Sequence, residues 1–121
     1  MTVLIAGTDS AEGQAAYAYG LREAARRGEE LLYFVLSGER PAPETAAEAG
    51  VTETYAEPDS RGKDGVGDLL DMAERIDASV IVIGIRHRTP ASKFIMGSAA
   101  QQVILQANTP VICVKPGKAP Y

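Results

Sequence analysis

Four basic side chains gather in one short stretch of this sequence. The stretch reads GIRHRTPASKFIMGSA over residues 84–99, and its basic side chains are Arg86, His87, Arg88 and Lys93. Gly97 and Ser98 end it directly before a helical pattern. The first backbone N–H groups of a helix have no partner within the helix, and the helix dipole adds positive potential there. The stretch is therefore either a phosphate-binding loop or a solvent-exposed basic connection.

A second polar segment lies where the first strand should end. Thr8, Asp9 and Ser10 follow the apolar run TVLIAG. In an open parallel sheet, ligands bind beyond the carboxyl ends of the strands, where the strand order reverses. We therefore expect this segment and the basic stretch to border one cleft. Residues 7–10 (GTDS) do not form a P-loop, because they are too few and lack its lysine, and the three-glycine dinucleotide motif is also missing after this run.

The elements that must position these residues alternate along the chain. Short apolar runs predict strands over residues 2–7, 30–36, 51–57, 79–85 and 111–115. Helical spacing predicts helices over residues 11–27, 44–49, 66–76 and 98–107. The alternation predicts one α/β domain over residues 1–121, with a parallel sheet and helices on both faces. We expect the run SVIVIGI near the centre of the sheet and VTETYAE near an edge.

Several side chains are expected at defined places on these elements. Asp9 or Ser10 should cap the first helix, and Asp64 the third. In the first helix, Ala18, Leu21 and Ala25 should form the buried stripe. In the last helix, Val103, Ile104 and Ala107 should point inward. Cys113 lies in the apolar run PVICV, which predicts a buried, inert thiol rather than a nucleophile.

The composition and charge of the chain argue against two classes of protein, nucleic-acid binders and membrane-spanning proteins. The 121 residues are 45% hydrophobic and 23% charged, with a formal net charge of −4. An acidic balance argues against a general nucleic-acid binder, and no segment is apolar over the ~20 residues that span a bilayer. The start of the chain lacks a signal-peptide pattern, and a single cysteine suits a reducing compartment, so we expect a cytoplasmic protein.

Catalytic chemistry is not expected. The best acid–base candidates are Asp9 and His87, which can equally be a capping or ligand-binding residue and a loop residue. The sequence pattern offers neither a nucleophile–base–orienter set nor a metal-ligand cluster. We therefore expect a binding protein rather than an enzyme.

Most of the chain resembles one known family. VIVIGIRHRTPASKFIMGSAAQQVILQANTPVICVKPG, residues 80–117, is similar to the C-terminal signature of the universal stress protein family. That signature is Gly-x2-Gly-x9-Gly-Ser/Thr, and Gly84, position 87, Gly97 and Ser98 fall at its spacing. Residues 2–36 resemble the family's opening strand, Asp-containing turn, helix and second strand. Residues 37–63 match poorly.

The resemblance implies a fold, a ligand and a partner. The fold would be a parallel sheet in the order 3-2-1-4-5, like that of the adenine nucleotide alpha hydrolases. A homodimer would form through the last strand, residues 111–115. ATP or another adenine nucleotide, with Mg²⁺ as a candidate companion, would lie across the ends of the first and fourth strands. Thr8 and Asp9 would contact the adenosine, backbone near Val35 the base, and the ribose and phosphates would be held by Gly84, Gly97, Ser98 and Ala99.

One departure leaves alternatives open. His87 stands where the ATP-binding pattern has its second glycine; it would either crowd the phosphate path or, with Arg86, contact phosphate. The first reading is a stress-response regulator that binds a nucleotide. The alternative is a dimeric interaction module of the same family without a nucleotide. A third possibility is a phosphoacceptor receiver domain, whose Asp, Asp and Lys-Pro spacing would fall on Asp9, Asp59 and residues 115–116.

Overall fold

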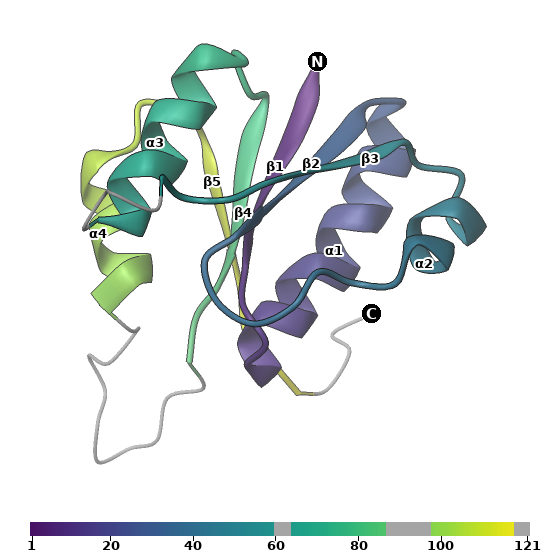
Figure 1. The fold of residues 1–121 in the computed structure, drawn as a ribbon, viewed down its shortest axis with the longest axis horizontal. Helices are drawn as coiled ribbons and strands as arrows, with labels where there is room; N and C mark the ends of the chain where they lie inside the picture. Colours follow the sequence, from purple (N-terminus) through teal and green to yellow (C-terminus); the bar gives the residue numbers. More distant parts are fainter. Residues whose placement is uncertain (60–63, 87–97, 118–121) are drawn as a thin grey trace.

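The computed structural model describes residues 1–59, 64–86 and 98–117, which form one five-stranded parallel sheet flanked by helices (Figure 1). The strands are β1 (Thr2–Gly7), β2 (Glu30–Val35), β3 (Glu53–Ala56), β4 (Val80–Gly84) and β5 (Val111–Val114). The helices are α1 (Ala11–Arg27), α2 (Pro43–Glu48), α3 (Gly65–Arg75) and α4 (Ser98–Gln106). Every strand and helix expected from the sequence is present.

The sheet has the order β3-β2-β1-β4-β5, as the resemblance implied. The chain runs outward from β1 to β3, then returns past β1 to form β4 and β5. The order therefore reverses between β1 and β4, whose carboxyl ends lie side by side. A receiver domain has the flavodoxin-like order 2-1-3-4-5, so the third possibility is wrong.

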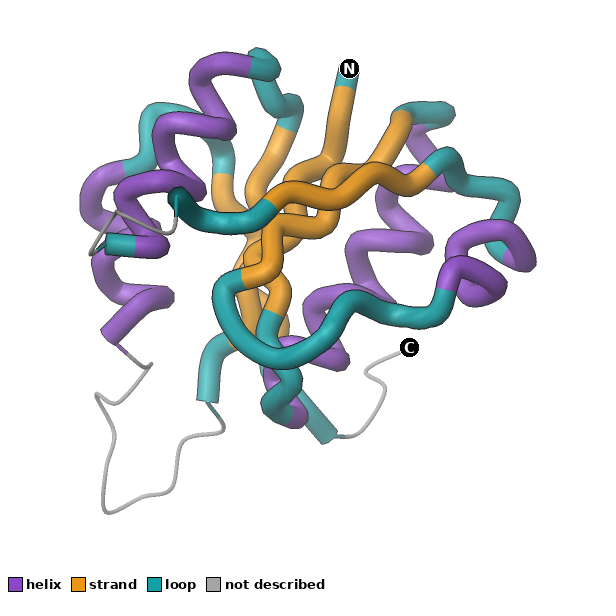
Figure 2. Tube along the Cα trace, viewed as in Figure 1, coloured by secondary structure: helices purple, strands orange, loops and turns teal. Residues whose placement is uncertain are grey.

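Helices cover both faces of the sheet (Figure 2). Helices α1 and α2 lie on one face, over a core that includes Val3, Ile5 and Leu31. Helices α3 and α4 lie on the other, over a core that includes Leu4 and Phe34. Consecutive β1 residues alternate between the two cores, because successive side chains of a strand point to opposite faces. The apolar run TVLIAG is thus buried on both sides.

The ends of α1 follow the sequence signals closely. Ser10 is its N-cap and accepts a hydrogen bond from the Gly13 N–H at 3.1 Å, so the cap is Ser10 rather than Asp9. Gly28 ends the helix in the left-handed conformation, with φ of 68°. Asp64 takes the N-cap position of α3, as expected, but its side chain makes no capping hydrogen bond.

Three burial expectations were also wrong. Along α1, Leu21 and Ala24 are buried, whereas Ala18 and Ala25 are exposed. On α4, Ile104 is 38% exposed. Cys113 is exposed on the edge strand β5 rather than buried. In the part of the chain that the structure describes, no helix is long and apolar enough to cross a membrane.

Candidate functional site

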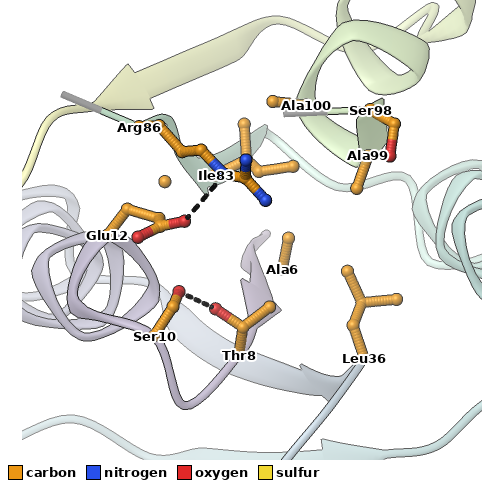
Figure 3. Close-up of a pocket in the computed structure, with 11 residues that line it drawn as sticks. Ala6, Thr8, Ser10, Glu12, Leu36, Ile83, Arg86, Ser98, Ala99 and Ala100 are labelled. Atoms are coloured by element: carbon orange, nitrogen blue, oxygen red, sulfur yellow. Dashed lines mark hydrogen bonds and ion pairs between the residues drawn. The ribbon is translucent and has the colours of Figure 1, made fainter. Parts of the chain in front are cut away.

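A cavity of about 150 Å³ opens where the strand order reverses. It lies on the α3 and α4 side of the sheet, because Ala6, Ile83 and Ala100 belong to the core beneath those helices. Figure 3 shows the side chains around it. The lining residues are Ala6, Thr8, Ser10, Glu12, Leu36, Ile83, Gly84, Arg86, Ser98, Ala99 and Ala100.

The turn between β1 and α1 forms one wall. The Thr8 and Ser10 hydroxyl oxygens lie 2.7 Å apart in a hydrogen bond, and Ser10 also caps the helix. A Cβ at Gly13 would overlap the Thr8 side chain and lie 2.5 Å from its carbonyl oxygen. Glycine at position 13 therefore lets α1 begin tightly against Thr8, which holds both hydroxyls at the cavity.

Gly84 has a packing role that the motif alone does not reveal. A Cβ on Gly84 would overlap the backbone carbonyl of Glu12 and lie 2.9 Å from the Glu12 Cβ, closer than real side chains approach. The glycine thus allows the first turn of α1 to lie against the end of β4. This contact brings the β1 and β4 walls of the cavity together.

One charged pair stands at the cavity. The Arg86 Nε atom lies 3.9 Å from the Glu12 Oε2 atom, and the side chains are 64% and 25% exposed. Opposite them, Ser98 and Ala99 form the first turn of α4, whose leading N–H groups have no partner within the helix. The cavity therefore combines hydroxyl donors, a guanidinium and a helix N-terminus with apolar side chains of the sheet.

The structure brings together five of the residues expected from the sequence: Thr8, Gly84, Arg86, Ser98 and Ala99. Asp9 instead lines a second cavity, which also borders Thr8. Val35 lines neither cavity, although it pairs with Gly7 across β1 and β2. His87, Arg88, Lys93 and Gly97 lie outside the described residues.

Three further lining residues lie at strand ends. Ser10 belongs to the segment expected at the cleft, and it also caps α1. Leu36 follows β2, and its N–H donates to the Gly7 carbonyl at 2.8 Å, which carries it to the same edge. Glu12 was not expected from the sequence, although its place in the first turn of α1, just after the capping residue, indicates that it lies at the carboxyl end of β1.

Metal and thiol chemistry find no support in the described residues. There, no group of three His, Cys, Asp or Glu side chains could hold a metal ion. Partial burial raises the pKa of the Cys113 thiol, which disfavours the reactive thiolate.

Comparison with known proteins identifies the relatives. The profile of the universal stress protein family matches residues 56–115. A universal stress protein of Mycolicibacterium smegmatis (strain ATCC 700084 / mc(2)155) is 36% identical, and the match covers 86% of this chain and 89% of the relative.

Solved structures show the same fold over nearly the whole chain. A universal stress protein from Archaeoglobus fulgidus is 32% identical, with a TM-score of 0.72, and the match covers 94% of this chain and 97% of that one. A structure of the universal stress protein from the same organism in complex with dAMP is 28% identical, with a TM-score of 0.69, and covers 94% and 96%. The fold and these identities lead to one conclusion: the chain belongs to the universal stress protein family.

Proposed function

We propose that this protein binds an adenine nucleotide in the cavity between the ends of β1 and β4 and acts as a cytoplasmic stress-response regulator rather than as an enzyme. The observation that carries the proposal is the pairing, in one cavity, of the α4 N-terminus and Arg86 with apolar side chains. A nucleotide has the matching halves, because its phosphate is anionic and its base is largely apolar on both faces. The dAMP complex of the Archaeoglobus fulgidus relative supports the same ligand class.

The proposal gives each described lining residue a role. Ser98 and Ala99 would hold phosphate through the N–H groups of the α4 first turn, assisted by Arg86. The Thr8 and Ser10 hydroxyls would face the sugar, and Leu36 would lie against the base. The family resemblance adds Asp9 and Val35 on the adenosine side and Gly97 on the phosphate side, and His87, which replaces a family glycine, would either crowd the phosphate path or contact phosphate. Mg²⁺ would enter only with the nucleotide, and ATP hydrolysis, if measured, should be slow.

Ala99→Asp tests the cavity directly. A carboxylate in the first turn of α4 suits the helix dipole, so the fold should persist, yet it would occupy and repel the phosphate position. In calorimetric titrations with AMP and ATP, we expect at least a tenfold loss of affinity. Gln101→Glu is the matched control, because it adds the same charge on the exposed side of α4 and should leave affinity unchanged. The proposal fails if the wild type binds no nucleotide or if Ala99→Asp binds as tightly as the wild type.

A dimeric interaction module is the second candidate function, and β5 is the observation that favours it. β5 is an edge strand, and its Val111, Ile112 and Val114 side chains are only half-buried against the rest of the molecule. A second copy could pair with the open side of this ladder. Mass analysis of small molecules released on denaturation separates the two functions, since a module without a ligand would release no nucleotide.

A further inference from the structure

The segment after β2 runs from the proposed nucleotide site to β3. We name this segment, residues 36–41 (LSGERP), the strap. Leu36 lines the cavity of the nucleotide site, and the first two N–H groups of the strap donate to the Gly7 carbonyl at 2.8 and 3.2 Å. Near the other end, the Arg40 guanidinium lies over the Tyr55 ring of β3, 4.7 Å from the ring centroid. The strap is therefore tied to β1 at one end and to β3 at the other.

Between these two ends the strap lies against Asp9, in the turn between β1 and α1. Gly38 has a φ of 75°, and a Cβ on it would lie 2.6 Å from the Asp9 Cβ and 3.0 Å from the Asp9 Oδ2. Glycine at position 38 thus allows the strap backbone to touch the Asp9 side chain. From the α1 side, the Gln14 side-chain amide donates to the Asp9 carbonyl at 3.4 Å. The position of the Asp9 carboxylate therefore depends on where the strap lies.

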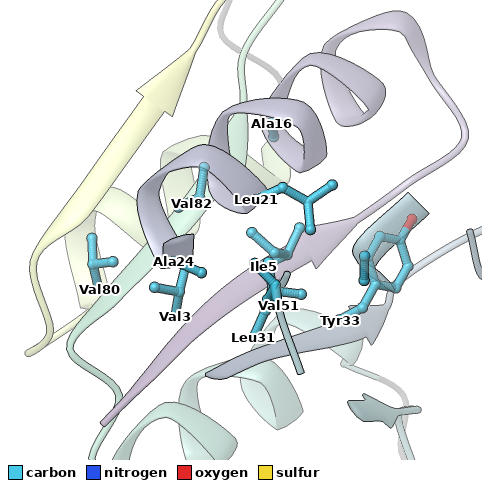
Figure 4. Packing of buried hydrophobic residues seen from close by; sticks show 11 residues of the cluster. Val3, Ile5, Ala16, Leu21, Ala24, Leu31, Tyr33, Val51, Val80 and Val82 are labelled. Carbon is cyan, nitrogen blue, oxygen red and sulfur yellow. The ribbon is translucent and has the colours of Figure 1, made fainter. Parts of the chain in front are cut away.

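The middle of the strap spans an open space rather than resting on the core. The second cavity, of about 350 Å³, is lined by the strap residues Gly38, Glu39 and Pro41 and also by Tyr17 and Tyr33. Figure 4 shows Tyr33 at one end of the core beneath α1, with its hydroxyl directed away from the aliphatic side chains. Because a cavity separates the middle of the strap from these rings, the strap depends on its two ends for its position.

The contact between Arg40 and Tyr55 fastens the outer end. The face of a tyrosine ring carries partial negative charge and attracts a guanidinium. The Tyr55 hydroxyl donates to the Glu53 Oε2 atom at 2.6 Å, which fixes the ring. Within the described part of the chain, Arg40 forms no ion pair. Its contact with the Tyr55 ring is thus the charged contact that holds the strap to β3.

We infer that Arg40 and Tyr55 are positioning residues for the nucleoside half of the ligand, an inference that rests on the proposed nucleotide function. Arg40, held on the Tyr55 ring, keeps the strap against Asp9 and keeps Leu36 at the cavity. The proposed function places the base and the sugar on this side, whereas the phosphates lie toward α4 and Arg86. Without the contact, the ligand must itself order the strap, and this ordering lowers its affinity.

The test is a calorimetric titration of the full chain with adenosine, AMP and ATP. Arg40→Ala should weaken all three by the same factor of about three, the scale of an exposed cation–π contact, because the three ligands share the nucleoside. Arg22→Ala is the matched control, since Arg22 lies over the Tyr19 ring on α1, 5.7 Å from its centroid, and should leave the affinities unchanged. A loss that is larger for ATP than for adenosine would show that Arg40 acts on phosphate by its charge, and would overturn the inference.

Variants of Tyr55 separate positioning from a general loss of structure. Tyr55→Phe keeps the ring face and should bind like the wild type, whereas Tyr55→Leu should weaken the three ligands as Arg40→Ala does. The double variant Arg40→Ala/Tyr55→Leu should bind no more weakly than either single variant, because both remove one contact. Additive losses, or an Arg40→Ala variant that binds like the wild type, would overturn the role of this pair alone. A wild type that binds none of the three ligands would instead refute the proposed function itself.

Discussion

Glu12 and Arg86 face each other at the cavity between β1 and β4, with the Arg86 Nε atom 3.9 Å from the Glu12 Oε2 atom. The pair joins the first turn of α1 to the segment after β4, and both side chains line the proposed nucleotide site. A phosphate that enters must share Arg86 with the Glu12 carboxylate and lie close to that carboxylate. Glu12 therefore opposes the charge that the rest of the site attracts, and its effect should grow with the charge of the ligand.

The first prediction follows from this opposition. Glu12→Gln should strengthen nucleotide binding, because it frees Arg86 and removes a like charge. Two charges about 4 Å apart interact by about 1 kcal/mol in water, so AMP should gain roughly threefold to fivefold in affinity and ATP more than AMP. Adenosine should gain nothing. Calorimetric titration of the three ligands measures the ratio, and Glu44→Gln on α2 controls for net charge. Equal gains for adenosine and ATP would contradict the electrostatic account.

The second prediction concerns the packing role of Gly84. Gly84→Ala should destabilise the protein by about 1–3 kcal/mol, the usual cost of overpacking, because the added Cβ meets the Glu12 backbone, which cannot swing away as a side chain could. Urea unfolding measures the loss. Gly65→Ala is the control, since its nearest neighbour would be the Leu36 side chain at 3.4 Å, an ordinary contact. If the two variants were equally stable, Gly84 would serve only ligand approach.

Gly84 and Glu12 also show how far the sequence could predict the site. The strand order and the location of the cleft follow from apolar runs and helical spacing, which are local signals repeated along the chain. Gly84 was also found from its motif spacing. Its contact with Glu12 could not be found that way, because it joins residues 72 positions apart through the register of β1 and β4. The exposure of Cys113 differs from the prediction although the order 3-2-1-4-5 already placed its strand at an edge, because the burial of a side chain on an edge strand depends on the elements that pack over it, which the apolar run itself does not specify.

The third prediction uses the charge cluster on α1. The buried Glu23 carboxylate accepts hydrogen bonds from the Arg26 guanidinium and, at 2.8 Å, from the Arg27 Nε atom. These hydrogen bonds lower the pKa of Glu23 below 4.5. A lowered folded-state pKa means that the stabilisation is present above about pH 4.5 and is lost as the pH falls through the folded-state pKa.

Glu23→Gln should therefore cost about 1 kcal/mol at pH 7, the sum of two helical ion pairs of ~0.3–0.5 kcal/mol each. The cost should shrink as the pH falls from 4.5 through the lowered folded-state pKa of Glu23. Thermal unfolding over a series of pH values from 7 downward tests it, with Glu44→Gln as the control variant. A cost that stays constant with pH would assign the role of Glu23 to packing rather than to charge.

The last prediction concerns the proposed homodimer through β5. Ile81 N–H donates to the Pro110 carbonyl, and Ile85 N–H donates to the Val114 carbonyl, each in the ladder between β4 and β5. The backbone N–H and C=O groups of successive residues in a strand point to opposite sides. Those of residues 110, 112 and 114 therefore point toward β4, and those of Val111 and Cys113 point away from the sheet. The Cys113 N–H is thus available to a second copy without loss to the sheet.

Cys113→Pro should remove that outward donor while leaving the bonds to β4 in place, since proline is tolerated on edge strands when its missing N–H would face solvent. We expect a monomer, or a dimer at least tenfold weaker, in light scattering at micromolar concentration, with an unchanged far-ultraviolet circular dichroism spectrum. Cys113→Ser keeps the N–H and should dimerise like the wild type. If the proline variant remains as dimeric as the serine variant, copies of this chain do not pair through β5, because a ladder that lacks its central donor could not form unchanged.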